Sequence, residues 1–126
     1  MMAQFRKRDT GPELALREAL SRQGVPFDTY LDLPGSPDIV LTKTKVVVFV
    51  HGCFWHGCPK HYRLPRSNRA YWIRKLARNQ SRDRANARRL RNMGWHVATI
   101  WECSLARDPD AAVDRILRVG TRRSPA

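Results

Sequence analysis

The chain has 126 residues, which is enough for one compact domain and too few for two independent cores. It carries 24 Lys and Arg against 11 Asp and Glu, a formal net charge of +13. Such an excess destabilises a compact state by self-repulsion unless a polyanion offsets it, and it is typical of nucleic-acid-binding proteins. A basic surface that only keeps the protein soluble is the alternative.

The sequence also limits where the protein works. It has no run of about 18 apolar residues, and its first residues lack the apolar core of a secretory signal. We therefore expect a cytoplasmic protein without membrane contact. Three cysteines in a reducing compartment argue against a disulfide framework and leave metal binding, catalysis or burial.

The N-terminal part predicts a basic arm followed by a helix. We expect the first nine residues to contact DNA phosphates through Arg6, Lys7 and Arg8. Thr10 is the expected N-cap of the helix, and Gly24 is expected to end it. Glu13 stands at the third helical position, where its carboxylate would close a capping box.

The middle of the chain predicts strands joined by tight turns. Residues 27–31 form a short candidate strand, and residues 33–37 have the composition of a turn. Residues 39–41 and 45–50 then predict a β-hairpin, with Asp38 at its head. The unbroken apolar run of the second strand indicates burial on both faces.

The second strand leads into a segment that is dense in reactive side chains. Three histidines, two cysteines and two large aromatic residues lie within eleven positions: His51, Cys53, Phe54, Trp55, His56, Cys58 and His61. Packing alone does not require this mixture, and a rigid strand end is a suitable place to hold reactive groups. A lone histidine is more often structural, but two beside a candidate metal carboxylate favour catalysis.

The C-terminal half predicts a long helix between residues 63 and 93, capped by Ser67. An apolar stripe that includes Ile73 runs along one side of this helix, and arginines occupy its other sides. Asp83 interrupts the stripe, either as an ion-pair partner or as an active-site group that orients a histidine. A strand at 94–101 should deliver Glu102 and Cys103. A last helix, capped by Asp108 or a neighbour, should run through residue 119, and residues 120–126 are expected to be disordered.

Five segments together carry a family resemblance: Pro37-Asp38-Ile39-Val40, residues 49–56, Tyr71-Trp72, Arg82-Asp83-Arg84, and Gly94-Trp95 with Trp101-Glu102-Cys103. From about residue 10 to 103 the chain closely resembles the very-short-patch-repair (Vsr) mismatch endonucleases. The resemblance implies a single restriction-endonuclease-like α/β domain over residues 10–119, with a central mixed sheet flanked by helices and a structural zinc. It also implies a magnesium-dependent endonuclease that nicks double-stranded DNA 5′ of the thymine in T:G mismatches left by 5-methylcytosine deamination, which initiates very short patch repair.

The resemblance implies roles for individual residues as well. Asp38 would hold magnesium, and the backbone carbonyl of Val50 would be a second ligand, because the carboxylate that related folds place on this strand is absent here. His56 would be the general base, assisted by His51. The implied catalytic residues are Asp38, His51, His56, Glu13 and Asp83.

The cysteines predict a zinc site. Cys53, Cys58, His61 and Cys103 make four soft or borderline ligands, the number that a structural zinc requires. Their spacing differs from that of a zinc ribbon, and three buried thiols are the alternative. Relatives often have a histidine before the second cysteine of this loop, whereas here Cys58 precedes His61, so the ligand order stays open.

Three aromatic residues predict how DNA is engaged. Phe54, Trp55 and Trp72 resemble the wedge by which Vsr enzymes open a base stack beside a mismatch, although each ring alone could belong to the core. We expect a monomer that acts on mismatched double-stranded DNA in the nucleoid, with other mismatch-repair proteins as candidate partners. The alternatives are a nuclease of the same fold for another mismatch, a modified base or a restriction-type site, and a non-catalytic, zinc-stabilised DNA-binding module.

Overall fold

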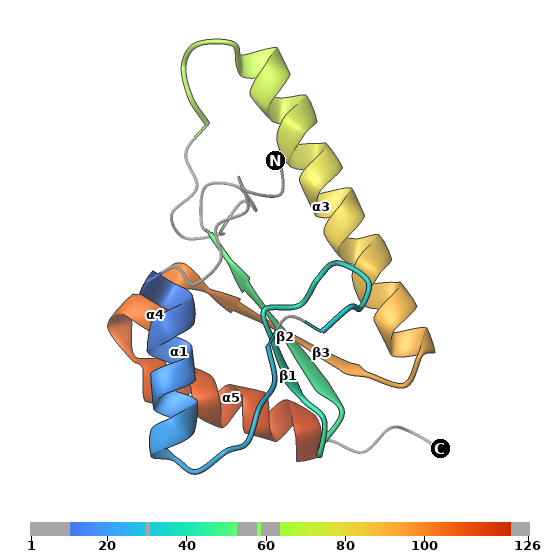
Figure 1. Cartoon of the computed structure of the whole chain (residues 1–126). Coiled ribbons are helices and arrows are strands. Elements are labelled where there is room, and N and C mark those ends of the chain that lie inside the picture. Colours follow the sequence, from blue (N-terminus) through green and yellow to red (C-terminus); the bar gives the residue numbers. More distant parts are fainter. Residues whose placement is uncertain (1–10, 30, 53–57, 59–63, 122–126) are drawn as a thin grey trace.

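The computed structural model describes residues 11–29, 31–52, 58 and 64–121 (Figure 1). The elements are α1 (Gly11–Arg22), β1 (Ile39–Leu41), β2 (Val46–His51), α3 (Arg69–Asn92), β3 (His96–Trp101), α4 (Glu102–Arg107) and α5 (Pro109–Thr121). The strands form a mixed sheet in the order β1-β2-β3, in which β2 is antiparallel to β1 and parallel to β3. The predicted mixed α/β architecture, a sheet flanked by helices, is confirmed. Within the described residues no helix is both long and apolar enough to span a membrane.

The alternation of side chains along the strands divides the core into two layers. Successive residues of a strand point to opposite faces of the sheet. On one face Val46 and Val48 pack with Leu16, Leu20 and other apolar residues of α1, α4 and α5. On the other face Val47 packs against a smaller cluster that contains Leu90 of α3 and Val40 of β1. The sheet is therefore buried on both faces, as the apolar run predicted.

Glycines end two of the helices by the same hydrogen-bonding arrangement. After α1, Gly24 has a φ of 70°, its amide donates to the Ser21 carbonyl, and the Val25 amide donates to the Leu20 carbonyl. This pair of bonds defines a Schellman motif, which satisfies carbonyls that the helix end leaves open. The prediction that Gly24 ends the helix is confirmed. Gly94, with a φ of 96°, closes α3 in the same way.

A tight turn fixes the place at which Asp38 enters the sheet. Residues 33–36 form a turn closed by a 2.9 Å hydrogen bond between the first carbonyl and the last amide. Pro34 occupies the second position and Gly35 the third, with a φ of 78°, as a type II turn requires. A Cβ atom on Gly35 would lie 3.0 Å from the side-chain nitrogen Nδ2 of Asn86. The turn thus lies directly against α3.

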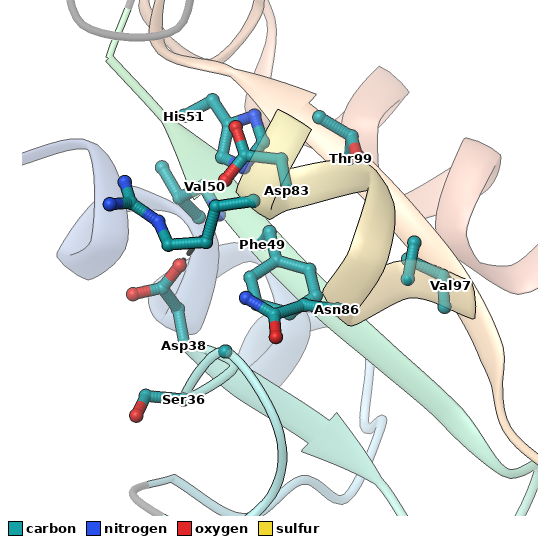
Figure 2. Close-up of a pocket in the computed structure, with 12 residues that line it drawn as sticks. Ser36, Asp38, Phe49, Val50, His51, Asp83, Asn86, Val97 and Thr99 are labelled. Atoms are coloured by element: carbon teal, nitrogen blue, oxygen red, sulfur yellow. Dashed lines mark hydrogen bonds between the residues drawn. The ribbon is translucent and has the colours of Figure 1, made fainter. Parts of the chain in front are cut away.

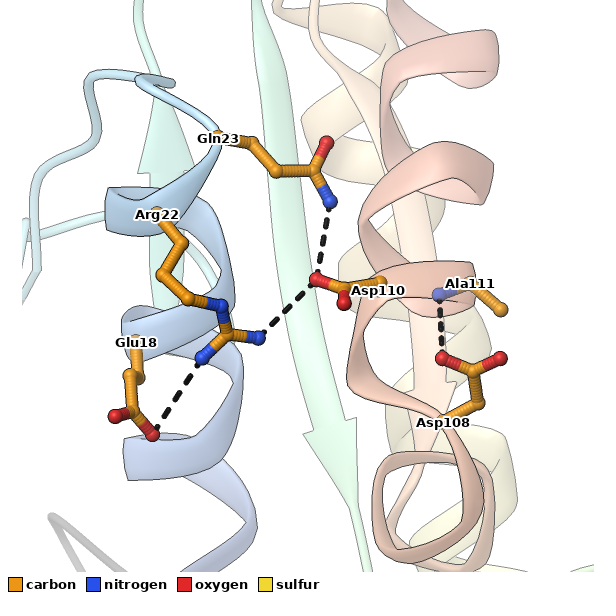
Figure 3. A network of polar contacts seen from close by, with 6 residues as sticks. All are labelled: Glu18, Arg22, Gln23, Asp108, Asp110 and Ala111. Carbon is orange, nitrogen blue, oxygen red and sulfur yellow. Dashed lines mark hydrogen bonds and ion pairs between the residues drawn. The ribbon is translucent and has the colours of Figure 1, made fainter.

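Polar contacts fasten α5 to α1 (Figure 3). The Asp110 carboxylate accepts hydrogen bonds of 3.2 Å from Gln23 and from Arg22, and these bonds lower the pKa of that carboxyl. Asp108 accepts a 3.2 Å bond from the Ala111 amide, so its side chain caps α5 as predicted. The helix ends at Thr121, two residues beyond the predicted domain boundary at 119.

Two local predictions are wrong. Within the described residues, segment 27–31 is not a strand but a single bridge in which Asp28 and Val40 exchange two 2.8 Å backbone bonds. β1 has three residues, and of these only Val40 directs its amide and carbonyl away from β2. Segment 27–31 therefore finds a single residue to pair with and cannot form a longer ladder. Ser67 does not cap α3, because the N-cap is Asn68, in a left-handed conformation without a side-chain capping bond.

The segment after β3 was predicted only in part. Glu102 and Cys103 follow directly from β3, as expected, but they also form the first turn of a short helix, α4, that the sequence analysis did not predict. An acidic residue in the first turn is favoured by the helix dipole.

Candidate active site

A cavity of about 560 Å³ lies between the sheet and α3 (Figure 2). Its polar side chains come from β2, β3, α3 and the segment that precedes β1. These residues are Ser36, Asp38, His51, Arg82, Asp83, Asn86 and Thr99. Residues separated by up to 63 positions in the chain therefore face one space.

The sheet pleat explains why these side chains converge. Ile39 and Val50 pack on the α1 side, so their neighbours Asp38, Phe49 and His51 point to the α3 side. The hydrophobic pattern that buries the strands thus also aims the polar groups at their ends into the cavity.

Asp38 is held rigidly at the cavity wall. Its Oδ2 atom accepts a 2.7 Å hydrogen bond from the amide of Val50, and its own amide donates to the Val48 carbonyl over 3.0 Å. The carboxylate thus takes the place of a backbone acceptor immediately before β1. Hydrogen bonding of this kind fixes a carboxylate in one orientation, as a metal ligand requires.

His51 ends β2 between two aromatic rings. Its ring lies 5.4 Å from that of Trp101 in an edge-to-face arrangement and 6.0 Å from that of Phe49. Asp83 projects from α3 into the same space, and its carboxylate is directed toward the His51 ring in Figure 2. The structure therefore brings together Asp38, His51 and Asp83, together with the backbone of Val50.

Arg82 lines the cavity, although the sequence indicated it only as one of the arginines of the long helix and as part of the Arg82-Asp83-Arg84 segment. Its Nη2 atom donates a 3.1 Å hydrogen bond to Oδ1 of Asn79, which is only 7% exposed. Asn79, Asp83 and Asn86 follow at spacings of four and three, which places them on one face of α3. This polar stripe was the available signal that the helix turns a reactive face to the sheet.

Glu13 occupies a different environment. It lies on α1, is 3% exposed, and accepts a 3.3 Å bond from Nη2 of Arg17. It is not among the described residues that line the cavity. Thr10, its expected partner in a capping box, lies outside the described residues, and the catalytic role of Glu13 stays a prediction.

Trp72 lies near the start of α3, half-buried, and packs edge-to-face on the exposed ring of Tyr71 at 5.0 Å. Ile73, predicted to belong to an apolar stripe, is 52% exposed, because the first half of α3 extends beyond the sheet (Figure 1). Eight predicted site residues lie outside the described part of the chain: Arg6, Lys7, Arg8, Cys53, Phe54, Trp55, His56 and His61.

Two of the predicted zinc ligands lie side by side. The Sγ atoms of Cys58, which is buried, and Cys103 are 3.7 Å apart, and neither residue forms a disulfide. Over residues 11–29, 31–52, 58 and 64–121, no three His, Cys, Asp or Glu side chains gather closely enough to hold a metal ion. Both remaining predicted ligands, Cys53 and His61, fall outside these ranges.

Comparison with known proteins identifies relatives along most of the chain. The family profile described as "DNA mismatch endonuclease Vsr" matches residues 1–62. The chain is 39% identical over 100 residues to the DNA mismatch endonuclease Vsr of Escherichia coli, which covers 78% of this chain and 64% of that protein. It is 46% identical over 114 residues to the type II nicking enzyme V.NaeI of Lentzea aerocolonigenes, with 86% and 69% covered. It is 43% identical over 109 residues to the type II nicking enzyme V.XorIIP of Xanthomonas oryzae pv. oryzae, with 84% and 79% covered.

The chain belongs to the Vsr DNA mismatch endonuclease family. This confirms the family predicted from the segments at 37–40 and 49–56. As a Vsr-family protein it is a DNA endonuclease, a hydrolase whose substrate is DNA, and enzymes of this class generally use a divalent metal ion.

Proposed function

We propose that this Vsr-family endonuclease nicks one strand of duplex DNA 5′ of the thymine in a T:G mismatch, with magnesium, and so initiates very short patch repair. The observation that carries the proposal is the single cavity lined by Asp38, His51 and Asp83. One relative is named a DNA mismatch endonuclease and two others nicking enzymes, which supports cutting of one strand at a mismatch.

The donors at the cavity suit magnesium. This ion prefers oxygen ligands and is commonly bound by one or two carboxylates, water and substrate phosphate. Asp38 supplies a carboxylate. The amide of Val50 points toward Asp38, and because the amide and carbonyl of a strand residue face the same side, its carbonyl is directed there too. Asp38 and the Val50 carbonyl would hold the ion, and the ion would supply positive charge to the phosphate in the transition state.

The remaining cavity residues provide acid-base and electrostatic support. We assign the general base to His56, with His51 as a second acid-base group that Asp83 orients from α3. Arg82, which is braced by Asn79, would place a guanidinium on a phosphate oxygen, for which its planar fork is well suited. We also propose Glu13 as a catalytic residue, although it is not among the described residues that line the cavity.

Recognition of the faulty pair is assigned to aromatic residues. Phe54, Trp55 and Trp72 would enter the base stack beside the mismatch. Inserting rings costs a few kcal/mol of unstacking, and the cost is least where base pairing is already weak. A wedge therefore converts weak pairing into selectivity for the mismatch.

We also propose a structural zinc held by Cys53, Cys58, His61 and Cys103. Two sulfurs bound to one tetrahedral zinc at about 2.3 Å would lie about 3.8 Å apart. The Cys58 and Cys103 sulfurs are 3.7 Å apart, so this half of the proposed site fits the ion without movement. Such a site would tie the segment that contains His56 to α4, directly after β3.

The test of this function is nicking of duplexes that differ at one base pair. We expect the strand with the mismatched thymine to be cut 5′ of that base, only with magnesium, and roughly 100-fold or more faster than a matched T:A duplex, since a few kcal/mol of unstacking separates them. The break would be mapped on labelled strands. Equal rates on T:A and T:G would refute mismatch specificity, and faster cutting at another mismatch or a modified base would favour the alternative substrates.

A further inference from the structure

A second cleft, of about 450 Å³, runs along α3 next to the active-site cavity. Its basic wall consists of Arg84, Arg88 and Arg91. Asp83, Ala87 and Thr99 line both spaces, so the cleft adjoins the cavity lined by Asp38 and His51. A ligand as extended as a DNA strand could therefore contact both.

The three arginines have no electrostatic partner in the described structure. They are exposed, and over the described residues none forms an ion pair or a side-chain hydrogen bond. The helix has nine Lys and Arg residues and a single acid, Asp83. Arg84 and Arg88 are four residues apart, a spacing at which like charges destabilise a helix by a few tenths of a kcal/mol. Folding gains nothing from this arrangement, whereas a bound polyanion would stabilise it.

We propose that this arginine cleft binds the sugar-phosphate backbone of the DNA strand adjacent to the scissile phosphate. The inference rests on the DNA substrate of the family and not on T:G specificity. Arg84 to Arg91 spans about 10 Å of helix at about 1.5 Å per residue. Phosphates of one strand rise about 3.4 Å each along the duplex axis, so the cleft covers two or three of them.

The chemistry of the cleft suits phosphates rather than bases. Arginine forks pair bidentately with phosphate oxygens, and such contacts set the position of a duplex without reading its sequence. Asp83, the acid in the cleft, stands at the junction with the active-site cavity, where it faces His51 in Figure 2. The cleft would therefore hold the strand in register while the cavity acts on one phosphodiester.

The salt dependence of DNA binding tests the proposal. Each phosphate contact contributes about 0.9 to the slope of log K against log salt concentration. The triple variant Arg84→Gln, Arg88→Gln, Arg91→Gln is expected to lower that slope by roughly 2 to 3, equally for T:G and T:A duplexes. Binding is measured over a KCl series without divalent metal, so that nicking does not interfere.

A matched control removes the same charge elsewhere. Lys43, Arg107 and Arg115 are exposed and do not line the cleft, and their triple replacement by Gln should lower the slope by less than about 1. An unchanged slope in the cleft variant, or an equal fall in both triples, would overturn the proposal. If the cleft triple loses helicity by circular dichroism, Arg88→Gln alone must lower the slope by about 0.9 for the proposal to stand. Failure of mismatch-specific nicking would leave this result unaffected.

Discussion

Replacing Asp38 with Asn is expected to lower the nicking rate by about 10³-fold or more, because the loss of several kcal/mol of transition-state stabilisation corresponds to that factor. Asn can still accept the 2.7 Å hydrogen bond from the Val50 amide, so the local fold should persist. What disappears is the negative charge on a hard oxygen, which magnesium requires. Single-turnover nicking at saturating enzyme would measure the chemical step, and DNA binding should remain near that of the unaltered protein.

Asp32 provides a matched control for this variant. It is an exposed carboxylate that precedes Asp38 by six residues and does not line the cavity. Asp32→Asn should leave the nicking rate within about twofold, as expected for a surface substitution. If Asp38→Asn nicked as fast as Asp32→Asn, the assignment of Asp38 to the metal would be wrong.

The second large effect is expected at Cys103. Replacing it with Ser should release the proposed zinc and lower the free energy of unfolding by roughly 3 kcal/mol or more, because binding of a structural zinc is coupled to folding. For a domain of this size the melting temperature would fall by about 10 °C. Zinc content by elemental analysis of the purified protein is the decisive reading, since it does not depend on activity. Cys58→Ser should behave in the same way.

The neighbouring Ser104→Ala variant controls for a disturbance of α4. It should retain one zinc per chain and an unfolding free energy within about 0.5 kcal/mol. Asp38→Asn should also retain zinc while it fails to nick, which separates the two proposed metal sites. If the unaltered protein were purified without zinc, or if Cys103→Ser still contained one zinc per chain, the alternative that the thiols are simply buried would be favoured.

Much of the fold could be predicted because burial leaves a regular pattern in the sequence. The run from Val46 to Val50 is apolar at every position since both faces of the sheet are covered. Gly24 marks a helix end because only a residue that tolerates positive φ can close a Schellman motif without strain. Asp108 caps α5 by a bond that depends only on local sequence.

Other features depend on how distant elements meet, which local patterns do not encode. Arg82 has the same sequence character as the other arginines of α3, and only the position of the helix over the sheet shows that it faces the cavity. The spacing of Glu13 predicts its place in the first turn of the helix, but only the packed structure shows that its side chain is buried. Ile73 matches a helical apolar stripe, but the sheet does not extend far enough to cover it.

In the candidate site, too, some features follow from local sequence and others depend on tertiary packing. The proximity of Asp38 to Val50 follows from the β-hairpin that the sequence predicted, and His51, the next residue of that strand, lines the same cavity. The position of Asp83 opposite them required tertiary packing, and sequence alone left two interpretations open for it. The structure places Asp83 in the same cavity as His51, which favours the orienting role that we propose.

The most direct test of the cavity as the catalytic centre is the location of the metal ion in a crystal of the enzyme with a T:G duplex and Mn²⁺ in place of Mg²⁺. An anomalous difference map should show manganese within coordination distance of an Asp38 carboxylate oxygen and the Val50 carbonyl, in contact with the phosphate 5′ of the thymine. Manganese bound to that phosphate through other residues, with Asp38 outside its coordination sphere, would contradict the assignment.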